Sequence, residues 1–323
     1  MTFNALRLVV ACLACAFVAP VFADEPFPSK TIRVVVPFPP AGPNDLMARL
    51  VAPRMSELFG KPVIVENRGG ATGTIGTGAV VKSAPDGHVL LLTPNQPIVI
   101  APALFQTPYD PAKDLIAVAT LGESTNALVV SASSPINSLA DLIAAAKAKP
   151  GALTFSSSGQ GSIGHLTGEM IKQFAGIDIL HVPYAGAGQS ITAVVSGEVT
   201  MSGSSIQQSL PLIKAGKLKP LGVTGLRPSK YLPELKTLSD QGLKGLSITV
   251  WYAAYLPAKT PQSIVQSWRK TLLTTFQDPL VQQKLDGVGI EWLWQEPDQI
   301  GARIETELGQ WRKVVHAAHI TAH

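Results

Sequence analysis

Two glycine- and proline-rich loops carry the residues best suited to chemistry. One spans 157–165 and contains Gly159, Gly161 and Gly164, between a strand-like run at 153–158 and a helical run at 163–175. The other spans 37–45 and has the same strand–loop–helix setting. The first turn of a helix has N–H groups without intrahelical partners, and it attracts anions. We therefore expect the two loops to hold a carboxylate between them.

The glycine loop has the spacing of a dinucleotide-binding fingerprint but lacks its acidic residue. That residue should end the next strand, yet the run at 179–182 ends in Pro183-Tyr184, and Asp178 precedes it. NAD binding is therefore disfavoured. Two interpretations stay open, namely a turn without a ligand and anion capture assisted by Ser157, Ser158 and Ser162.

The loop at 37–45 also has a purely structural interpretation. Pro39 and Pro40 stiffen it, and Pro43 suits the first turn of a helix. Asn44 or Asp45 could then cap that helix. An acidic side chain at a helix start would oppose a bound anion, so capping suits Asp45 better than ligand contact does.

Catalytic motifs are missing from the sequence. It contains no GxSxG, no GxxxxGK[ST] and no HExxH, and its carboxylates are scattered through turns. His165 lies in the first turn of its predicted helix, where it could reach a ligand, although a lone histidine is more often structural. We expect neither a metal nor a cofactor.

The first 23 residues have the pattern of an export signal. Arg7 is followed by an apolar stretch at 8–18 and by Val21-Phe22-Ala23, which predicts cleavage after Ala23 and a periplasmic protein. Both cysteines, Cys12 and Cys15, fall inside this segment. A lipid-attachment site at Cys12 is disfavoured because only 8–11 would form its apolar core. The mature chain would have no disulfide.

Charge and hydropathy exclude some partners. The formal net charge of the 323 residues is +4, and loss of Arg7 with the signal leaves +3. No Lys/Arg run indicates nucleic-acid binding. No mature segment has the ~18 consecutive apolar residues that a membrane span needs. We expect a soluble, exported and monomeric protein.

Strand and helix patterns alternate, which predicts an α/β protein. The first half gives strands at 32–36, 62–66 and 89–93, with helices at 45–59 and 73–83. The pattern restarts in the middle, with strands at 126–131, 153–157, 179–182, 199–202 and 218–224, and helices at 138–149, 163–175, 190–196 and 209–215. Two tail helices follow, at 261–277 and 297–317. Short apolar strands separated by helices predict parallel sheets covered on both faces.

This alternation predicts two lobes. Lobe one would contain 24–125 plus 226–323, and lobe two would contain 126–225. Each would be a doubly wound sheet, with the ligand in the cleft between them at the carboxyl ends of the strands.

Several segments resemble Bug-type receptors, the periplasmic substrate-binding proteins of tripartite tricarboxylate transporters. The resemblance covers essentially the whole mature chain, and it is carried by the run 28–40, Val65-Glu66-Asn67-Arg68, Ala84-Pro85-Asp86-Gly87, Tyr109-Asp110-Pro111, His181-Val182-Pro183-Tyr184 and Ile213-Lys214-Ala215-Gly216-Lys217-Leu218. It implies a two-lobed periplasmic-binding-protein fold. It also implies that the loops at 38–45 and 157–165 grip the carboxylate.

The sequence departs from the family pattern where charged side chains are usual. A Gly-Gly-Gly-Thr-Asp type of loop reads Ala41-Gly42-Pro43-Asn44-Asp45, and the usual Tyr-Lys-Gly reads Tyr184-Ala185-Gly186. The later acidic or amide pair reads Gly203-Ser204-Ser205. A cleft with fewer charges favours an aromatic mono- or dicarboxylate over an amino acid.

The resemblance and the loops together predict an extracytoplasmic solute-binding protein. It would capture a small organic carboxylate by lobe closure and deliver it to integral-membrane transporter subunits. The expected ligand-binding residues are Phe38, Pro40, Ala41, Gly42, Asn44, Asp45, Asn95, Ser157, Ser158, Gly161, Ser162, His165, Tyr184, Ala185, Gly186, Ser204, Ser205 and Trp251. An exported enzyme acting on a small acid and a periplasmic ligand sensor remain as alternatives.

Overall fold

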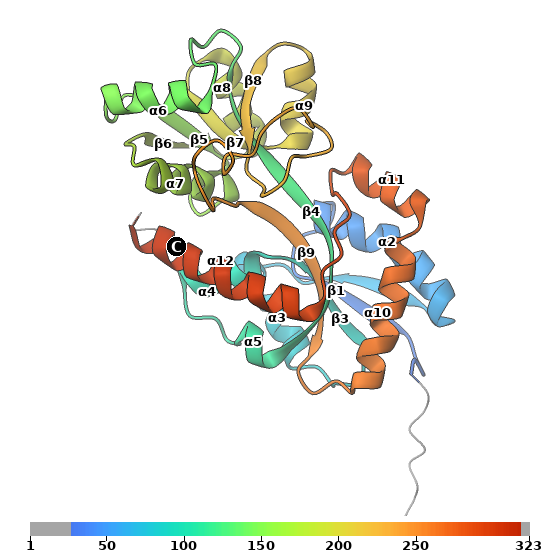
Figure 1. Ribbon diagram of the computed structural model, residues 1–323. Helices are drawn as coiled ribbons and strands as arrows, with labels where there is room; N and C mark the ends of the chain where they lie inside the picture. The colour runs from blue at the N-terminus through green and yellow to red at the C-terminus, as the bar shows by residue number, and fades with distance from the viewer. Residues whose placement is uncertain (1–26, 318–323) are drawn as a thin grey trace, which may run out of the picture.

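Two groups of parallel strands form the ends of one twisted sheet (Figure 1). The computed structural model describes residues 27–317, so the predicted signal peptide lies outside the described residues. The first group has the order β2-β1-β3, from β1 (Ile32–Val36), β2 (Val63–Asn67) and β3 (Val89–Pro94). The second has the order β7-β5-β6, from β5 (Thr154–Ser157), β6 (Leu180–Pro183) and β7 (Met201–Ser205). The strand runs predicted for these six elements are confirmed, with bounds that differ by at most three residues.

Two long antiparallel strands join the groups. β4 (Leu115–Ser131) pairs with β9 (Thr249–Pro257) as far as Thr125, and from Asn126 onward it pairs with β7 and with β8 (Leu218–Val223). The prediction of parallel sheets is therefore incomplete, because the sheet is mixed. The predicted strand at 126–131 is the second half of β4. Its first half was missed because Gly122, Glu123 and Ser124 interrupt the apolar pattern.

The division into two lobes at 125/126 and 225/226 stays a prediction. The change of partners within β4 between Thr125 and Asn126 supports its first boundary. The segment after β8 favours a later second boundary. Val223 N–H donates to Lys236 O, and Leu238 N–H donates to Val223 O, so this segment folds against lobe two.

Helices cover both faces of each sheet half (Figure 1). The first half carries α2 (Pro43–Phe59), α3 (Thr74–Val81), α10 (Gln262–Phe276), α11 (Pro279–Gly287) and α12 (Pro297–Ala317), with the short η1 (Ala71–Gly73), η2 (Gln96–Ile100), α4 (Ala101–Leu104) and α5 (Pro111–Asp114). The second half carries α6 (Leu139–Ala148), α7 (Ile163–Ala175), α8 (Ala187–Ser196) and α9 (Ile206–Lys214).

Predicted helix bounds hold best where a cap is present. Ser138 caps α6 by accepting a hydrogen bond from Asp141 N–H at 3.0 Å, as its sequence predicts. The predicted helix at 163–175 is α7 residue for residue. α8 and α9 begin three residues earlier than predicted, because Gly186 and Ser205 provide no side-chain cap to mark their starts. α11 was not predicted.

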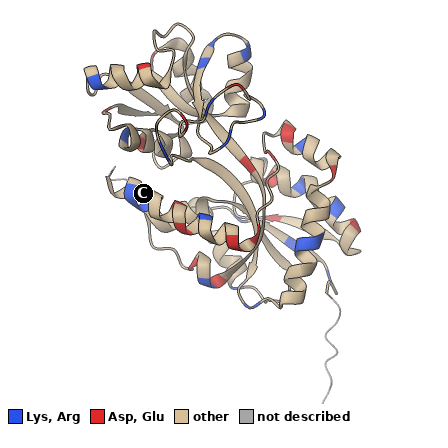
Figure 2. Ribbon diagram, viewed as in Figure 1, with Lys and Arg blue, Asp and Glu red and all other residues tan. Residues whose placement is uncertain are grey.

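α12 packs along the junction of the two halves. It contributes four buried side chains to a core cluster that also contains Leu91 from β3 and Leu166 from α7, namely Ile300, Ile304, Trp311 and Val314. Lys, Arg, Asp and Glu lie mostly on the outer helices and loops, with both signs interspersed (Figure 2). Within residues 27–317, no helix is long and apolar enough to cross a membrane.

Candidate ligand-binding cleft

A cavity of about 200 Å³ lies at the carboxyl ends of β5 and β7, where α7, α8 and α9 begin. We call it the serine pocket, because it is lined by Asn126, Ser157, Ser158, Ile163, Gly164, Ala187, Ser190, Ser202, Gly203, Ser204, Ser205, Gln208 and Val250. None of these lining side chains is charged. The serine pocket instead collects hydroxyl groups and the N–H groups of three helix first turns, which is a setting suited to an anion.

Local sequence explains how these helix starts face the pocket. Gly159 and Gly161 have φ angles of 124° and 73°, which allow the tight turn between β5 and α7. Ser162 then caps α7 by accepting a hydrogen bond from His165 N–H at 3.3 Å. α8 and α9 have no side-chain cap, so their first N–H groups remain available to a ligand or to water.

Asn126 is one of the buried polar side chains that line the serine pocket. Only 4% of its surface is exposed, and its Nδ2 has no hydrogen-bond partner in the part of the chain that the structure describes. A buried donor without a partner is costly, and native structures contain few of them. Asn126 is therefore positioned to donate to a bound ligand, although no sequence pattern singles it out.

A second cavity, of about 300 Å³, lies at the start of α2. We call it the proline pocket, and it is lined by Phe38, Pro39, Pro40, Gly42, Pro43, Asn44, Pro94, Gln96, Val250 and Tyr252. Asn44 donates its Nδ2 to Leu92 O at 2.9 Å, whereas its buried Oδ1 has no partner among residues 27–317. Val250 lines both pockets, so together they form one cleft with an apolar and a hydroxyl-rich half.

Asp45 supports the α2 loop from inside and does not line the proline pocket. Its carboxylate accepts hydrogen bonds from Ala41 N–H at 2.9 Å, from Arg49 Nε at 2.9 Å and from Asn67 Nδ2 at 2.9 Å. Burial raises the pKa of Asp45, but these hydrogen bonds outweigh it and the net pKa is lowered. Asp45 thus stays ionised and holds Ala41, whose φ of 67° is unusual for a residue with a side chain.

His165 and His181 stack beneath the glycine loop. Their ring centroids are 3.9 Å apart, and Gly161 N–H donates to His165 Nδ1 at 3.0 Å. Burial lowers the pKa of His181 to about 4, helped by the charges of His165 and Lys172, so the ring is neutral at pH 7. Burial also lowers the pKa of His165.

The same stack contains a Ser–His contact of the kind that an exported enzyme could use. Ser157 Oγ lies 2.7 Å from His181 Nε2, and it also donates to Gly159 O at 2.9 Å. The direction of the Ser157–His181 hydrogen bond depends on which ring nitrogen of His181 carries the proton. The contact supports the loop. Among residues 27–317, no group of three or more His, Cys, Asp or Glu side chains is arranged to hold a metal.

The structure brings eight of the predicted residues into the lining of the cleft. Four of them line the proline pocket, namely Phe38, Pro40, Gly42 and Asn44. The other four line the serine pocket, namely Ser157, Ser158, Ser204 and Ser205. The loops beside this lining contain Ala41, Gly161, Ser162, Ala185 and Gly186, while Asp45 and His165 lie in the first turns of α2 and α7. Tyr184 hydroxyl donates to Glu198 Oε1 at 2.9 Å.

Asn95 and Trp251 lie elsewhere. Both are fully buried, and Trp251 Nε1 donates to Glu307 at 2.9 Å, while Asn95 Nδ2 donates to Thr249 O at 3.1 Å. Neither belongs to the lining of the two pockets. The alternation of side chains along β9 explains this, since Val250 faces the cleft and its neighbour Trp251 faces the opposite side.

Sequence reasoning missed several lining residues, namely Asn126, Ser190, Ser202, Gln208, Val250 and Tyr252. Gln208 could have been found if α9 had been started at Ser205, because its first turn then follows the strand end directly. Val250 and Tyr252 carried no such signal, since their place depends on the pairing of β9 with β3 and β4.

Comparisons with known proteins show which family the chain resembles. A family model described as tripartite tricarboxylate transporter family receptor matches residues 47–320. BugT of Bordetella pertussis is 32% identical over 299 residues, which cover 92% of this chain and 91% of that protein. Among solved structures, an R. palustris protein with adipate is 31% identical with a TM-score of 0.72, covering 91% of this chain and 99% of that one. MatC from Rhodopseudomonas palustris with bound malate is 28% identical with a TM-score of 0.69, covering 90% and 100%.

Proposed function

Because the chain belongs to the tripartite tricarboxylate transporter receptor family, we propose that it captures a small organic carboxylate in the periplasm and delivers it to integral-membrane transporter subunits. The serine pocket carries this proposal. It combines three helix starts, several hydroxyl groups and the free Nδ2 of Asn126, and no carboxylate lines it to repel an anion. Relatives solved with adipate and malate support the same ligand class.

The ligand carboxylate occupies the serine pocket, and the rest of the ligand extends along Val250 into the proline pocket. Each hydrogen bond to a charged group contributes about 1.5–3 kcal/mol, so a few of them suffice for tight binding. Lobe closure over the hinge strands β4 and β9 then removes water from both pockets.

The ligand body is apolar and aromatic in the finer form of this proposal. Phe38, Tyr252 and four prolines make the far half of the cleft apolar, and an aromatic ring can lie against such a surface. Neither pocket has a charged side chain to compensate a ligand ammonium group, whose unpaired burial is costly. An aromatic mono- or dicarboxylate fits this lining better than an amino acid.

Export and assembly complete the proposal. Residues 1–23 act as a signal peptide that is removed after Ala23, and the mature receptor works as a monomer without a cofactor. It releases its ligand unchanged to the transporter.

A thermal-shift screen of mono- and dicarboxylates on the mature chain tests the proposal. An acid present at 100 times its dissociation constant stabilises the folded state by about 2.7 kcal/mol. Calorimetry then compares the best acid with its methyl ester, which should bind much more weakly. Equal affinity for acid and ester, or chemical conversion of the acid during incubation, would contradict a carboxylate receptor.

A further inference from the structure

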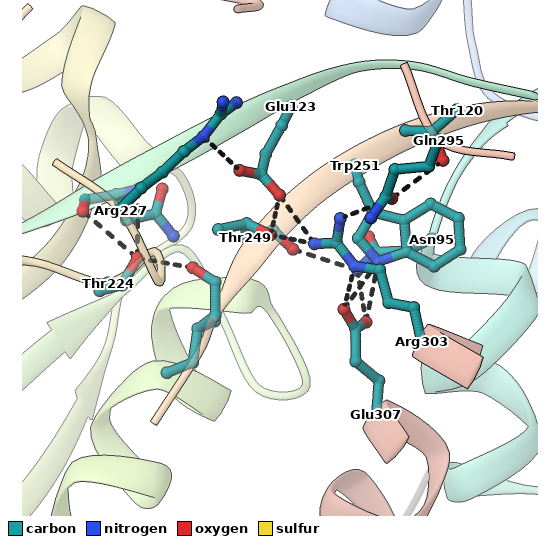
Figure 3. Close-up of polar contacts among 12 residues, drawn as sticks. Asn95, Thr120, Glu123, Thr224, Arg227, Thr249, Trp251, Gln295, Arg303 and Glu307 are labelled. Carbon is teal, nitrogen blue, oxygen red and sulfur yellow. Dashed lines mark hydrogen bonds and ion pairs between the residues drawn. The ribbon is translucent and has the colours of Figure 1, made fainter. Parts of the chain in front are cut away.

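A cluster of ionic and polar side chains lies against the hinge strands β4 and β9 (Figure 3). It contains Glu123 of β4, Thr249 and Trp251 of β9, and Arg303 and Glu307 of α12, and we call it the hinge cluster. Val250 lines both pockets, and its two neighbours in β9 point to the opposite face, where this cluster lies.

Arg303 is at the centre of the hinge cluster. Its Nη2 donates to Glu123 Oε2 at 2.8 Å and to Thr249 Oγ1 at 2.7 Å, and its Nε donates to Glu307 Oε1 at 2.7 Å. Only 16% of its side chain is exposed. Burial alone would lower the pKa of Arg303, but Glu307 and Glu123 raise it, so the guanidinium is charged.

Glu307 adds further contacts between α12 and β9. It accepts hydrogen bonds from Trp251 Nε1 at 2.9 Å and from Asn95 Nδ2 at 3.4 Å, while the guanidinium of Arg303 lies 5.1 Å from the centre of the Trp251 ring. α12 therefore holds β9 at Thr249 and Trp251, on both sides of Val250.

Glu123 also connects the hinge cluster to the segment that follows β8. Arg227 Nε lies 3.9 Å from Glu123 Oε1, which is longer than the hydrogen bonds and ion pairs that Arg303 makes. Three residues before Arg227, Thr224 N–H donates to Asn126 O at 2.9 Å, which ties the same segment to the serine pocket. The carboxylate of Glu123 is thus shared between α12 and the segment that packs on lobe two.

We propose that Arg303 is a positioning residue for ligand binding. It holds Val250 and the paired strands β4 and β9 from the face opposite the cleft, and so sets how the two pockets face each other. This inference rests on the proposed carboxylate-receptor function. Arg303 lines neither pocket, so its effect on affinity passes through the hinge.

The planar fork of arginine is what the hinge cluster requires. Arg303 reaches Glu123, Thr249 and Glu307 in one orientation, whereas the single ammonium group of a lysine cannot reproduce that geometry. Arg303→Lys keeps the positive charge between two buried carboxylates, so it should fold. Arg303→Met combined with Glu123→Gln and Glu307→Gln is a second variant, in which these three positions of the hinge cluster carry no charge.

The first measurement is ligand affinity by calorimetry, with the best acid from the screen. Arg303→Lys should bind at least tenfold more weakly, and the uncharged triple variant should bind weakly even if its unfolding temperature equals that of the wild type. Arg312→Met, on an exposed position of the same helix, should bind like the wild type. Wild-type affinity in Arg303→Lys, whatever its unfolding temperature, would overturn the proposal.

The second measurement needs no ligand and therefore separates this inference from the proposed function. The mature chain has no cysteine, so Lys82→Cys and Lys147→Cys introduce a unique pair for spin labels, one in each lobe. The distance distribution between the labels should be broader or shifted in Arg303→Lys and unchanged in Arg312→Met. An identical distribution in Arg303→Lys overturns the positioning role, whereas failure of the wild type to bind any carboxylate refutes only the proposed function.

Discussion

Replacing Asn126 by leucine should weaken ligand binding and at the same time stabilise the free protein. Asn126 Nδ2 is buried in the serine pocket without a partner in the described part of the chain. If it donates to the ligand carboxylate, its loss removes a hydrogen bond to a charged group, which contributes about 1.5–3 kcal/mol. Since 1.4 kcal/mol is tenfold in affinity, we expect binding weaker by about 10- to 150-fold.

The same substitution should stabilise the ligand-free protein, because it removes the buried donor that has no partner. A buried donor without a partner costs about 1–3 kcal/mol, and leucine of similar size removes this cost. Allowing for imperfect packing of the new side chain, the unfolding free energy should rise by about 1 kcal/mol, which is an increase of about 2 °C in the unfolding temperature.

Calorimetry with the best acid and thermal unfolding without ligand give the two quantities. Asn126→Asp should bind still more weakly, because it places a carboxylate opposite the ligand. Asn137→Leu, on an exposed turn away from both pockets, serves as the binding control. A leucine variant that binds as well as the wild type, or that is both weaker in binding and less stable, would refute the assigned role of Asn126.

Three further predictions address selectivity, pH and the glycine loop. Benzoate-like or phthalate-like acids should bind more tightly than aspartate or glutamate. Ala185→Lys should lower the affinity for an aromatic monocarboxylate or shift preference toward ligands with extra anionic groups. A competition assay in which aspartate displaces the aromatic acids would contradict this prediction. The pKa of His181 is lowered from 6.5 to about 4, so the unfolded chain takes up a proton that the folded one does not, and stability should fall as the pH drops from 6.5 to 4. His181→Gln should flatten that part of the stability profile, and an unchanged slope would argue against it. Gly161→Ala should cost about 1–2 kcal/mol of stability, because φ is 73° there while no other atom lies within 4 Å of the added carbon, and a variant as stable as the wild type would refute the strain.

The glycine-loop prediction differs from what the sequence alone suggests. From sequence, a side chain at residue 161 should block the approach of ligand to backbone. In the structure Gly161 is not part of the serine-pocket lining, whereas Gly164 is. The effect to measure at Gly161 is therefore conformational strain. A side chain that blocks the ligand would have to be placed at the start of α7, where Gly164 lines the serine pocket.

Sequence by itself determined the local features of this protein. The glycine turn before α7, the Ser138 cap of α6 and the strand–loop–helix units at 37–45 and 157–165 were all predicted. Each depends on backbone preferences and hydrogen bonds between residues a few positions apart, so the pattern of neighbouring residues is sufficient to specify it.

Tertiary structure decided which side of the hinge each residue faces. Trp251 and Glu307 meet across 56 positions in the chain, and Glu123 and Arg303 meet across 180. These contacts turn Trp251 and Asn95 away from the cleft and place Val250 and Asn126 in it. The choice between two strand faces follows from register and long-range charge pairing, which no local pattern around residue 123 or residue 251 contains.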